Sequence, residues 1–513
     1  MKKNIAYLLM ILTAVTVLIL NGCSDLLDQR PQGEWVEGDE GSGGSFQSDV
    51  FTLYAKIRGF HVTSGTTALA IHSFRSEDAE KGSTAADGAA HGVMYDDFEY
   101  IATNGLLGSY WTGNYEIINL ANKILYDIAQ AEEEKGTLSE GDLINKSEAH
   151  FFRAFAFFNL VRAFGEVPKI DFKIDKAEEA NIPKSAVSEI YTLIDNDLTT
   201  AEEHLPREWP PVYIGRLTWG AARSLHARAF MMRNDWNNMY TASTDVIHSG
   251  IYNLNTPYNQ IFRETGENSS ESVFELQCTA TPSQPESNDI GSQFAQVQGV
   301  RGAGEWNLGW GWNTPTENLA EAFEPGDPRK DETLLYFYKT GGDPNSIPGN
   351  QPYGEKPIAN ADVINKYYNK KAYTNPAMRL TFSKSGHWFN IRIIRYSDVV
   401  LMAAESANEL GKTVEAQGYL EMVRERARGN NASILPKVTT TNQEELRNAI
   451  RHERRVELGM EFDRFYDLVR WGIAMEVLHS AGKTKYQDKH QLLPLPQNEV
   501  DRSNGVLIQN PNY

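Results

Sequence analysis

The sequence contains few cysteines: only Cys23 and Cys278 occur among its 513 residues. Two cysteines cannot form the disulfide framework of a small secreted domain, and no Cys-x-x-Cys pair provides the usual spacing of a zinc site. With 41% hydrophobic and 11% aromatic residues, the chain has enough material to build its own core. The sequence therefore predicts a globular body that depends on neither disulfides nor metal ions.

Positive charge is also scarce. The chain has 49 lysines and arginines against 68 aspartates and glutamates, a formal net charge of −19 at pH 7. Because an acidic surface repels phosphate backbones and anionic lipids, we expect no nucleic-acid partner.

Signatures of common catalytic sites are absent as well. The sequence contains no His-Glu-x-x-His, Gly-x-Ser-x-Gly or P-loop pattern. Its 68 acidic residues make some pair of neighbouring carboxylates inevitable, so their number does not indicate a glycosidase. We therefore expect no catalytic residues and a binding protein rather than an enzyme.

The one long hydrophobic run lies at the N-terminus. Residues 5–20 carry no charge, follow Lys2 and Lys3, and are fewer than the roughly 20 residues that span a bilayer. This pattern predicts a signal peptide over residues 1–22. Its removal would change the net charge from −19 to −21, because the two lysines leave and no acid does.

Residues 20–23, with the sequence LNGC, resemble a bacterial lipobox, which implies lipid attachment at Cys23. The alternative is a free thiol or a disulfide with Cys278. The acidic residues Asp25 and Asp28 resemble the export signal of surface lipoproteins in Bacteroidota. Residues 23–48 are rich in Gly, Glu, Ser and Gln, and we expect them to form a flexible tether.

Apolar residues at three- and four-residue spacing predict a largely helical body. Helices are expected over residues 109–131, 146–164 and 187–204. The second of these is apolar on almost every face, which is typical of a helix buried between neighbours.

Two further segments share the plan of a helical hairpin. Residues 218–250 turn at Asn234-Asp235, and residues 395–429 turn at Gly411. Both are about 33 to 35 residues long, close to the tetratricopeptide period, so we expect the hairpins to stack. The predicted fold class is mainly α, with helical scaffolds over residues 49–252 and 391–513.

Residues 253–390 interrupt this helical pattern. They are rich in Gly, Pro, Asn, Gln and aromatic residues, and a short strand is expected at residues 272–277. A long irregular segment inside a compact protein usually serves function, so we interpret it as an inserted loop-rich ligand-binding lobe.

Six blocks of the sequence, in order, resemble lipoproteins of the SusD/RagB family. The blocks are W111xxxY115xxIxxANxI, residues 148–168 (EAHFFRAFAFFNLVRAFGEVP), residues 215–231 (GRLTWGAARSLHARAFM), residues 395–411 (RYSDVVLMAAESANELG), residues 451–472 (RHERRVELGMEFDRFYDLVRWG) and residues 492–513. They extend over nearly the whole chain after the lipobox.

The resemblance implies a tetratricopeptide-like scaffold with an irregular lobe, lipid-anchored to the outer membrane and exposed at the cell surface. It also implies capture of an oligosaccharide or polysaccharide and delivery to a SusC-like TonB-dependent transporter, without catalysis or a cofactor. RagB-type relatives serve peptide uptake, so a peptide or glycopeptide is an alternative ligand. A helical-repeat protein that only docks a protein partner is a third interpretation, against which exposed tryptophans argue.

The charged segment RHERRVELGMEF at residues 451–462 fits a structural role. We expect Glu453, Arg454, Glu457 and Arg464 to join helices through ion pairs, and a solvated charged face is the alternative.

The richest predicted ligand site is the glycine-rich segment 299–313. Sugar rings have apolar faces edged by hydroxyls, so their sites combine aromatic faces with hydrogen-bonding side chains. We expect a surface platform there, and the alternative is that two tryptophans pin the loop to the scaffold. The predicted contacts are Trp306, Trp310, Trp312, Arg301 and Asn307.

The second predicted ligand site lies in residues 74–98. Its candidate contacts are Arg75, Asp78 and Tyr95. The acidic residues of this segment include Asp87, Asp96 and Asp97, so bound calcium is a further hypothesis, although their spacing matches no known Ca²⁺ loop. A solvated loop is the simplest alternative.

Overall fold

The structure is a computed structural model that describes residues 43–84, 86–337, 350–355 and 363–513. The predicted signal peptide, Cys23 and the first part of the predicted tether lie outside the described residues. The end of that tether is already structured: the Ser45 amide donates to Asp142 at 2.6 Å, and the first described helix begins at Gln47.

Three long helices form where the apolar periodicity predicts them: α5 (Gly105–Lys135), α6 (Glu140–Phe164) and α7 (Val187–His204). The first two begin before their predicted starts because polar residues cap them. The side chains of Asn104 and Ser139 accept hydrogen bonds from amides in the first turns of α5 and α6. Every residue of α6 from Phe151 to Val161 is buried, which confirms a helix enclosed by its neighbours.

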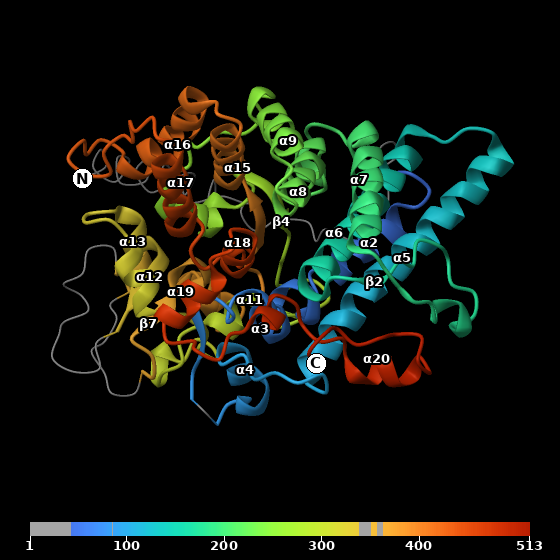
Figure 1. Cartoon of the computed structure of the whole chain (residues 1–513), viewed down its shortest axis with the longest axis horizontal. Helices are drawn as coiled ribbons and strands as arrows, with labels where there is room; N and C mark the ends of the chain where they lie inside the picture. Colours follow the sequence, from blue (N-terminus) through green and yellow to red (C-terminus); the bar gives the residue numbers. More distant parts are fainter. Residues whose placement is uncertain (1–42, 85, 338–349, 356–362) are drawn as a thin grey trace, which may run out of the picture. The chain divides into compact units, whose positions relative to one another are not determined.

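Both predicted hairpins are present. The first consists of α8 (Trp219–Met232) and α9 (Trp236–His248), and the second of α15 (Tyr396–Glu409) and α16 (Thr413–Arg428). Contacts run in order from α5 through α6, α7, α8 and α9 to α15 and α16, and Figure 1 shows these helices side by side. The stacked hairpins confirm the predicted helical scaffold.

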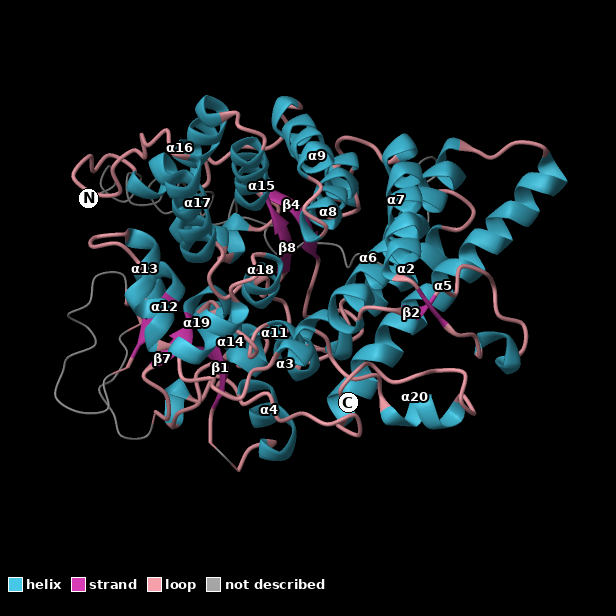
Figure 2. Cartoon of the chain, in the orientation of Figure 1, coloured by secondary structure: helices cyan, strands magenta, loops and turns pink. Residues whose placement is uncertain are grey.

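The irregular lobe leaves and rejoins this scaffold at a two-stranded ribbon. Strand β4 (Ser272–Leu276) pairs antiparallel with β8 (Ile391–Arg395), and Figure 2 shows the pair between α8 and α15. The strand predicted at 272–277 is therefore confirmed. Phe274 of β4 anchors the ribbon by packing edge-on against Phe151 of α6, with ring centroids 5.3 Å apart.

Most of the other described helices and strands are short, apart from α17 with 15 residues. Those before the lobe are α2 (Gln47–Ile57), the π-helix η1 (Phe60–Ser64), α3 (Thr66–His72), β1 (Ala79–Gly82), α4 (Ala89–Asp96), β2 (Val167–Pro168) and β3 (Lys184–Ser185). Those of the lobe are α10 (Tyr258–Ile261), α11 (Phe294–Gln298), β5 (Trp312–Pro315), α12 (Glu317–Ala322), α13 (Pro328–Thr333), β6 (Leu334–Tyr336), β7 (Tyr367–Asn369) and α14 (Pro376–Thr381). Those after it are α17 (Gln443–Glu457), α18 (Arg464–Arg470), α19 (Ala474–Ser480) and α20 (Gln497–Arg502).

Strand pairing crosses the predicted boundary at residue 253. Strand β1 from the N-terminal segment pairs antiparallel with β5 of the lobe, while β6 pairs with β7 inside it. The lobe therefore packs against the chain that precedes α5 as well as against the helical stack. Among the described helices, none combines the length and the apolar character needed to cross a membrane.

The predicted ion network lies at the centre of the C-terminal scaffold. The carboxylate of Glu457 accepts hydrogen bonds from Arg329 at 3.1 Å, Arg395 at 3.0 Å and Arg426 at 2.5 Å, and all of these side chains are buried. Burial alone raises the pKa of Glu457, but the nearby guanidinium groups outweigh this effect and hold the pKa well below its usual value.

Neighbouring groups extend the network to further elements. Glu453 pairs with Arg329 at 2.5 Å and with Arg424 at 2.8 Å, and Arg454 pairs with Asp398 and Asp467. The alternative of a solvated charged face is therefore wrong for this segment.

We predict that Glu457→Gln lowers the free energy of unfolding by about 3–5 kcal/mol, because it removes one buried carboxylate from a cluster in which three buried arginines must share the acidic partners that remain. Urea unfolding followed by circular dichroism measures the change. The matched control is Glu425→Gln on α16, where the side chain is exposed and little change is expected. Because the folded-state pKa of Glu457 is lowered, its contribution is present above pH about 4.3 and falls as the pH drops towards the folded-state value. Equal stability of the two variants would contradict the role of the network.

Candidate functional site

The structure brings the two predicted ligand segments together, although more than 200 residues separate them in sequence. Gly82 of β1 lies opposite Trp312 of β5, and the Lys81 ammonium lies 4.9 Å from the Trp312 ring centroid. Arg301 donates to Ser83 Oγ at 3.0 Å and pairs with Asp87. Pairing of β1 with β5 therefore makes these segments one part of the molecule.

Two of the three tryptophans lie inside this region rather than on its surface. Trp306 is only 7% exposed and packs edge-on against Phe337, with ring centroids 5.3 Å apart. Trp312 is 8% exposed and lies near Phe74. The predicted surface platform is therefore wrong for both residues. Burial of the large apolar indole ring in an aromatic cluster is more favourable than its exposure to water on a glycine-rich loop.

The candidate contacts of the second segment are also buried. Arg75 has no exposed surface and donates to the His490 carbonyl at 2.5 Å, while the Asp78 carboxylate accepts from Arg455 at 2.6 Å. Tyr95 is fully buried and stacks on Tyr100, with ring centroids 5.1 Å apart. The prediction that a ligand can reach Arg75, Asp78 and Tyr95 is therefore wrong. The interaction partners of all three side chains come from the protein itself.

Two of the acidic residues of this segment, Asp87 and Asp96, are likewise engaged with cations or an amide. Asp87 pairs with Arg301, and Asp96 accepts from the Lys81 amide at 2.8 Å and lies 3.4 Å from Lys483 Nζ. Burial raises the pKa of Asp96 to about 6, with Lys483 acting in the opposite direction. Within the described ranges, no group of three or more His, Cys, Asp or Glu side chains is placed to hold a metal ion.

Trp310, Arg301 and Asn307 keep solvent-accessible side chains. The Trp310 ring lies beside Phe60, with centroids 6.4 Å apart. Phe60 opens the π-helix η1, an irregular turn of a kind that often occurs at functional sites. The next residue of η1, His61, is exposed and lines a cavity, although Phe60 and Trp310 are not among the residues that line it.

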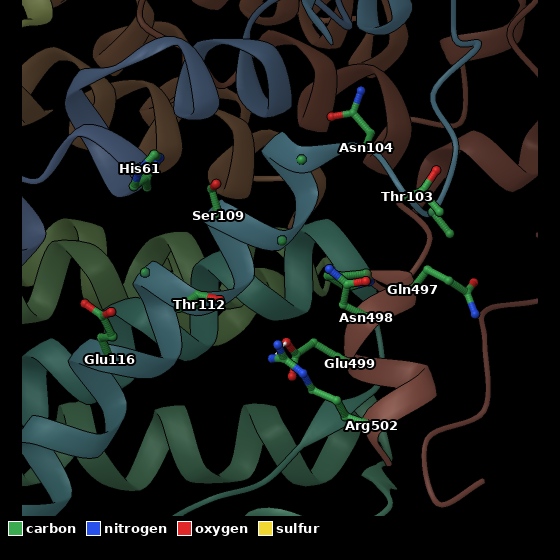
Figure 3. Close-up of a pocket in the computed structure, with 15 residues that line it drawn as sticks. His61, Thr103, Asn104, Ser109, Thr112, Glu116, Gln497, Asn498, Glu499 and Arg502 are labelled. Atoms are coloured by element: carbon green, nitrogen blue, oxygen red, sulfur yellow. Dashed lines mark hydrogen bonds and ion pairs between the residues drawn. The ribbon is translucent and has the colours of Figure 1, made fainter. Parts of the chain in front are cut away.

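This cavity, here called the α5–α20 groove, has a volume of about 440 Å³. Figure 3 shows α5 along one side, with Glu499 and Arg502 reaching across from α20. The volume falls within the usual range of ligand sites, about 300–1,000 Å³. Its lining residues are His61, Ala102, Thr103, Asn104, Gly105, Gly108, Ser109, Thr112, Gly113, Glu116, Pro496, Gln497, Asn498, Glu499 and Arg502.

The floor of the groove is a face of α5 with small side chains. Gly105, Gly108, Ser109, Thr112 and Gly113 recur at three- and four-residue spacing, so they share one face of the helix. A Cβ atom added at Gly105 or Gly108 would meet no atom within 4 Å. The absence of large side chains on this face leaves room for a ligand against the helix.

The start of α5 is held rigidly beneath the groove. Asn104 Oδ1 accepts from the Leu106 amide at 3.0 Å and from the Tyr95 hydroxyl at 3.3 Å. His61 Nδ1 lies 3.1 Å from Thr67 Oγ1, and burial lowers the pKa of His61, with Glu116 acting in the opposite direction. Tyr95 thus supports the groove from inside the protein.

Chemically, the groove offers hydroxyl, amide and carboxylate groups that can hydrogen-bond a ligand with many hydroxyls. Sequence reasoning missed it for two reasons. The spacing of small residues in α5 was a signal that could have been detected. However, α20 lies several hundred residues after α5 in the sequence, and it carries no motif that predicts its position against α5. Only tertiary packing brings Asn498, Glu499 and Arg502 opposite α5.

Two family models match the sequence. A model of the SusD family matches residues 270–513, and a model described as starch-binding and associating with the outer membrane matches residues 61–231. The first match contains the lobe beyond residue 270 and the C-terminal helices, and the second contains η1 from its second residue onward and all of α5.

Individual relatives agree with these matches. A SusD-like protein of Formosa agariphila is 27% identical over an alignment that covers all of both chains. A laminarin-binding SusD-like protein of known structure is 25% identical, with a TM-score of 0.72 over 91% of this chain and 98% of that chain. A surface glycan-binding protein of Bacteroides thetaiotaomicron, solved with laminarihexaose, shares the fold at 20% identity, with a TM-score of 0.73 over 91% of this chain and 99% of that chain.

We predict that Trp306→Ala lowers the free energy of unfolding by about 3–5 kcal/mol, because it empties a buried aromatic cluster. Trp310→Ala should cost less, about 1–2 kcal/mol, since its ring is only partly buried. Urea unfolding of the two variants tests this difference, and an equal loss would show that Trp310 also serves mainly to anchor the loop.

Proposed function

The chain belongs to the SusD-like family, and on this premise we propose that it binds a glycan in the α5–α20 groove. The observation that carries the proposal is a groove lined by hydroxyl and amide groups, with His61 of η1 in its lining next in sequence to Phe60, beside which the Trp310 ring lies. Sugar rings bind through both kinds of contact, because C–H faces stack on aromatic rings while hydroxyls exchange hydrogen bonds with polar side chains. The laminarin-binding relative supports this ligand class.

Within this proposal, the predicted ligand residues have different roles. Trp310, Arg301 and Asn307 have solvent-accessible side chains but do not line the groove, so they are candidate contacts for a glycan that extends beyond it. Trp306 and Trp312 hold the loop that presents Trp310, and Tyr95 supports the first turn of α5 through Asn104.

We further propose that the glycan is bound without being cleaved. The sequence contains none of the catalytic signatures sought above, and the relatives of known structure are described as binding proteins. A binding protein should retain its glycan intact, whereas a glycosidase would shorten it.

In the cell, the protein would act as a lipoprotein of the outer-membrane surface that delivers the glycan to a SusC-like TonB-dependent transporter. The lipobox-like sequence ending at Cys23 and the family description that mentions the outer membrane support this location. A RagB-like peptide ligand and a protein that only docks the transporter are the alternatives.

We predict that Gly108→Leu abolishes glycan retention without destabilising the protein. The leucine side chain would enter the groove where a new Cβ meets no atom within 4 Å, and replacing a helical glycine favours the helix by up to about 1 kcal/mol. Affinity electrophoresis of residues 29–513 in gels containing laminarin or starch should show a loss of at least about tenfold in affinity.

The matched control for this variant is Gly418→Leu. Gly418 is also exposed within a helix, α16, and its added Cβ would likewise meet no atom. Figure 1 shows α16 well separated from α5, so glycan retention should be unchanged. Undiminished retention by Gly108→Leu would place the ligand elsewhere, and retention of peptides alone would favour the RagB-like alternative.

A separate prediction concerns the anchor. Cys23→Ser should remove the protein from the outer-membrane fraction, because only a cysteine thiol can receive the lipid. Fractionation followed by immunoblotting measures the change, and Cys278→Ser serves as the control. Copurification of the wild-type protein with a TonB-dependent transporter tests the proposed partner, and its absence would argue against delivery.

A further inference from the structure

We infer that the α5–α20 groove selects an uncharged glycan over one that carries carboxylate or sulfate groups. This inference rests on the proposed function and names the class of glycan that the groove accepts.

The ionisable side chains that line the groove are His61, Glu116, Glu499 and Arg502. Lys56 Nζ lies 2.8 Å from the Glu116 carboxylate, just beyond the lining. Arg502 lies 3.3 Å from Glu499, one helical turn away on α20. Each acid therefore lies beside one cation, and these four side chains together carry no net formal charge that would favour an anionic ligand.

His61 adds no positive charge to this balance. Partial burial lowers the pKa of His61 from its usual value near 6.5, which favours the neutral ring at pH 7. A neutral imidazole can donate one hydrogen bond and accept another, which suits a sugar hydroxyl.

The remaining polar lining is made of neutral groups. Thr103, Asn104, Ser109, Thr112, Gln497 and Asn498 offer hydroxyls and amides, and none of these groups provides the bidentate fork with which arginine binds carboxylate or sulfate. The whole chain carries a formal net charge of −19, which adds a general repulsion towards polyanions. The ion pairs at the groove and the net negative charge of the chain therefore both disfavour binding of an anionic glycan.

The test compares neutral with anionic polysaccharides as probes. Residues 29–513 are run in gels containing laminarin or starch, and in gels containing alginate or carrageenan. We expect retention only by a neutral glycan, with an affinity that changes less than about twofold between about 0.05 M and about 0.5 M NaCl, because no net charge is exchanged on binding.

A charge-altered variant tests the cause. Glu116→Gln combined with Glu499→Gln frees Lys56 and Arg502, so the variant should gain retention by alginate or carrageenan at low salt and lose that gain at high salt. Retention by the neutral glycan should fall by about tenfold or less, because glutamine still offers a carbonyl acceptor. Glu425→Gln on α16 controls for the removal of a carboxylate elsewhere.

The outcomes are distinguishable. Equal or stronger retention of the wild-type protein by an anionic polysaccharide would overturn the inference while leaving glycan binding intact. A double variant that gains no anionic binding would show that charge pairing does not set the selectivity. Retention by neither class would contradict the proposed function itself and the inference with it.

Discussion

The pairing of one buried carboxylate with three arginines determines how the C-terminal half of the fold is assembled. Glu457 ends α17, and its partners come from α13, from the residue that closes β8, and from α16. Removing an ion from water costs several kcal/mol, so each arginine must reach its partner for the cost to be offset. Packings that separate these elements leave an unpaired buried charge and are strongly disfavoured.

The same network fixes the position of the binding region indirectly. Arg395 joins β8 to α17, and β8 pairs with β4, which sets where the lobe leaves the helical stack. The lobe in turn pairs with the N-terminal segment through β5 and β1 and brings Trp310 beside Phe60. The position of Trp310 thus depends on strand pairing and ion pairs made elsewhere in the fold.

Sequence reasoning succeeded where the signal was local. Apolar periodicity identified α5, α6, α7 and both hairpins, and the charge pattern of residues 451–462 identified the ion network. It failed for Trp306, Trp312, Arg75, Asp78 and Tyr95 because composition shows that a residue suits a sugar site but not which way its side chain points. The groove depends on α20 lying against α5, a contact between residues nearly 400 positions apart, and no local pattern encodes such a contact.

The ribbon formed by β4 and β8 has a consequence for how this protein can vary. It brings together the two ends of an excursion of more than 100 residues, and the lobe between them also contacts the helical stack through Arg329 of α13 and the segment before α5 through β5. Lengthening a loop whose ends are already joined adds little entropic cost. Exchanges of loop sequence between these strands that leave such contacts in place therefore cost little, and a single stack of helices can present many different recognition surfaces over evolutionary time.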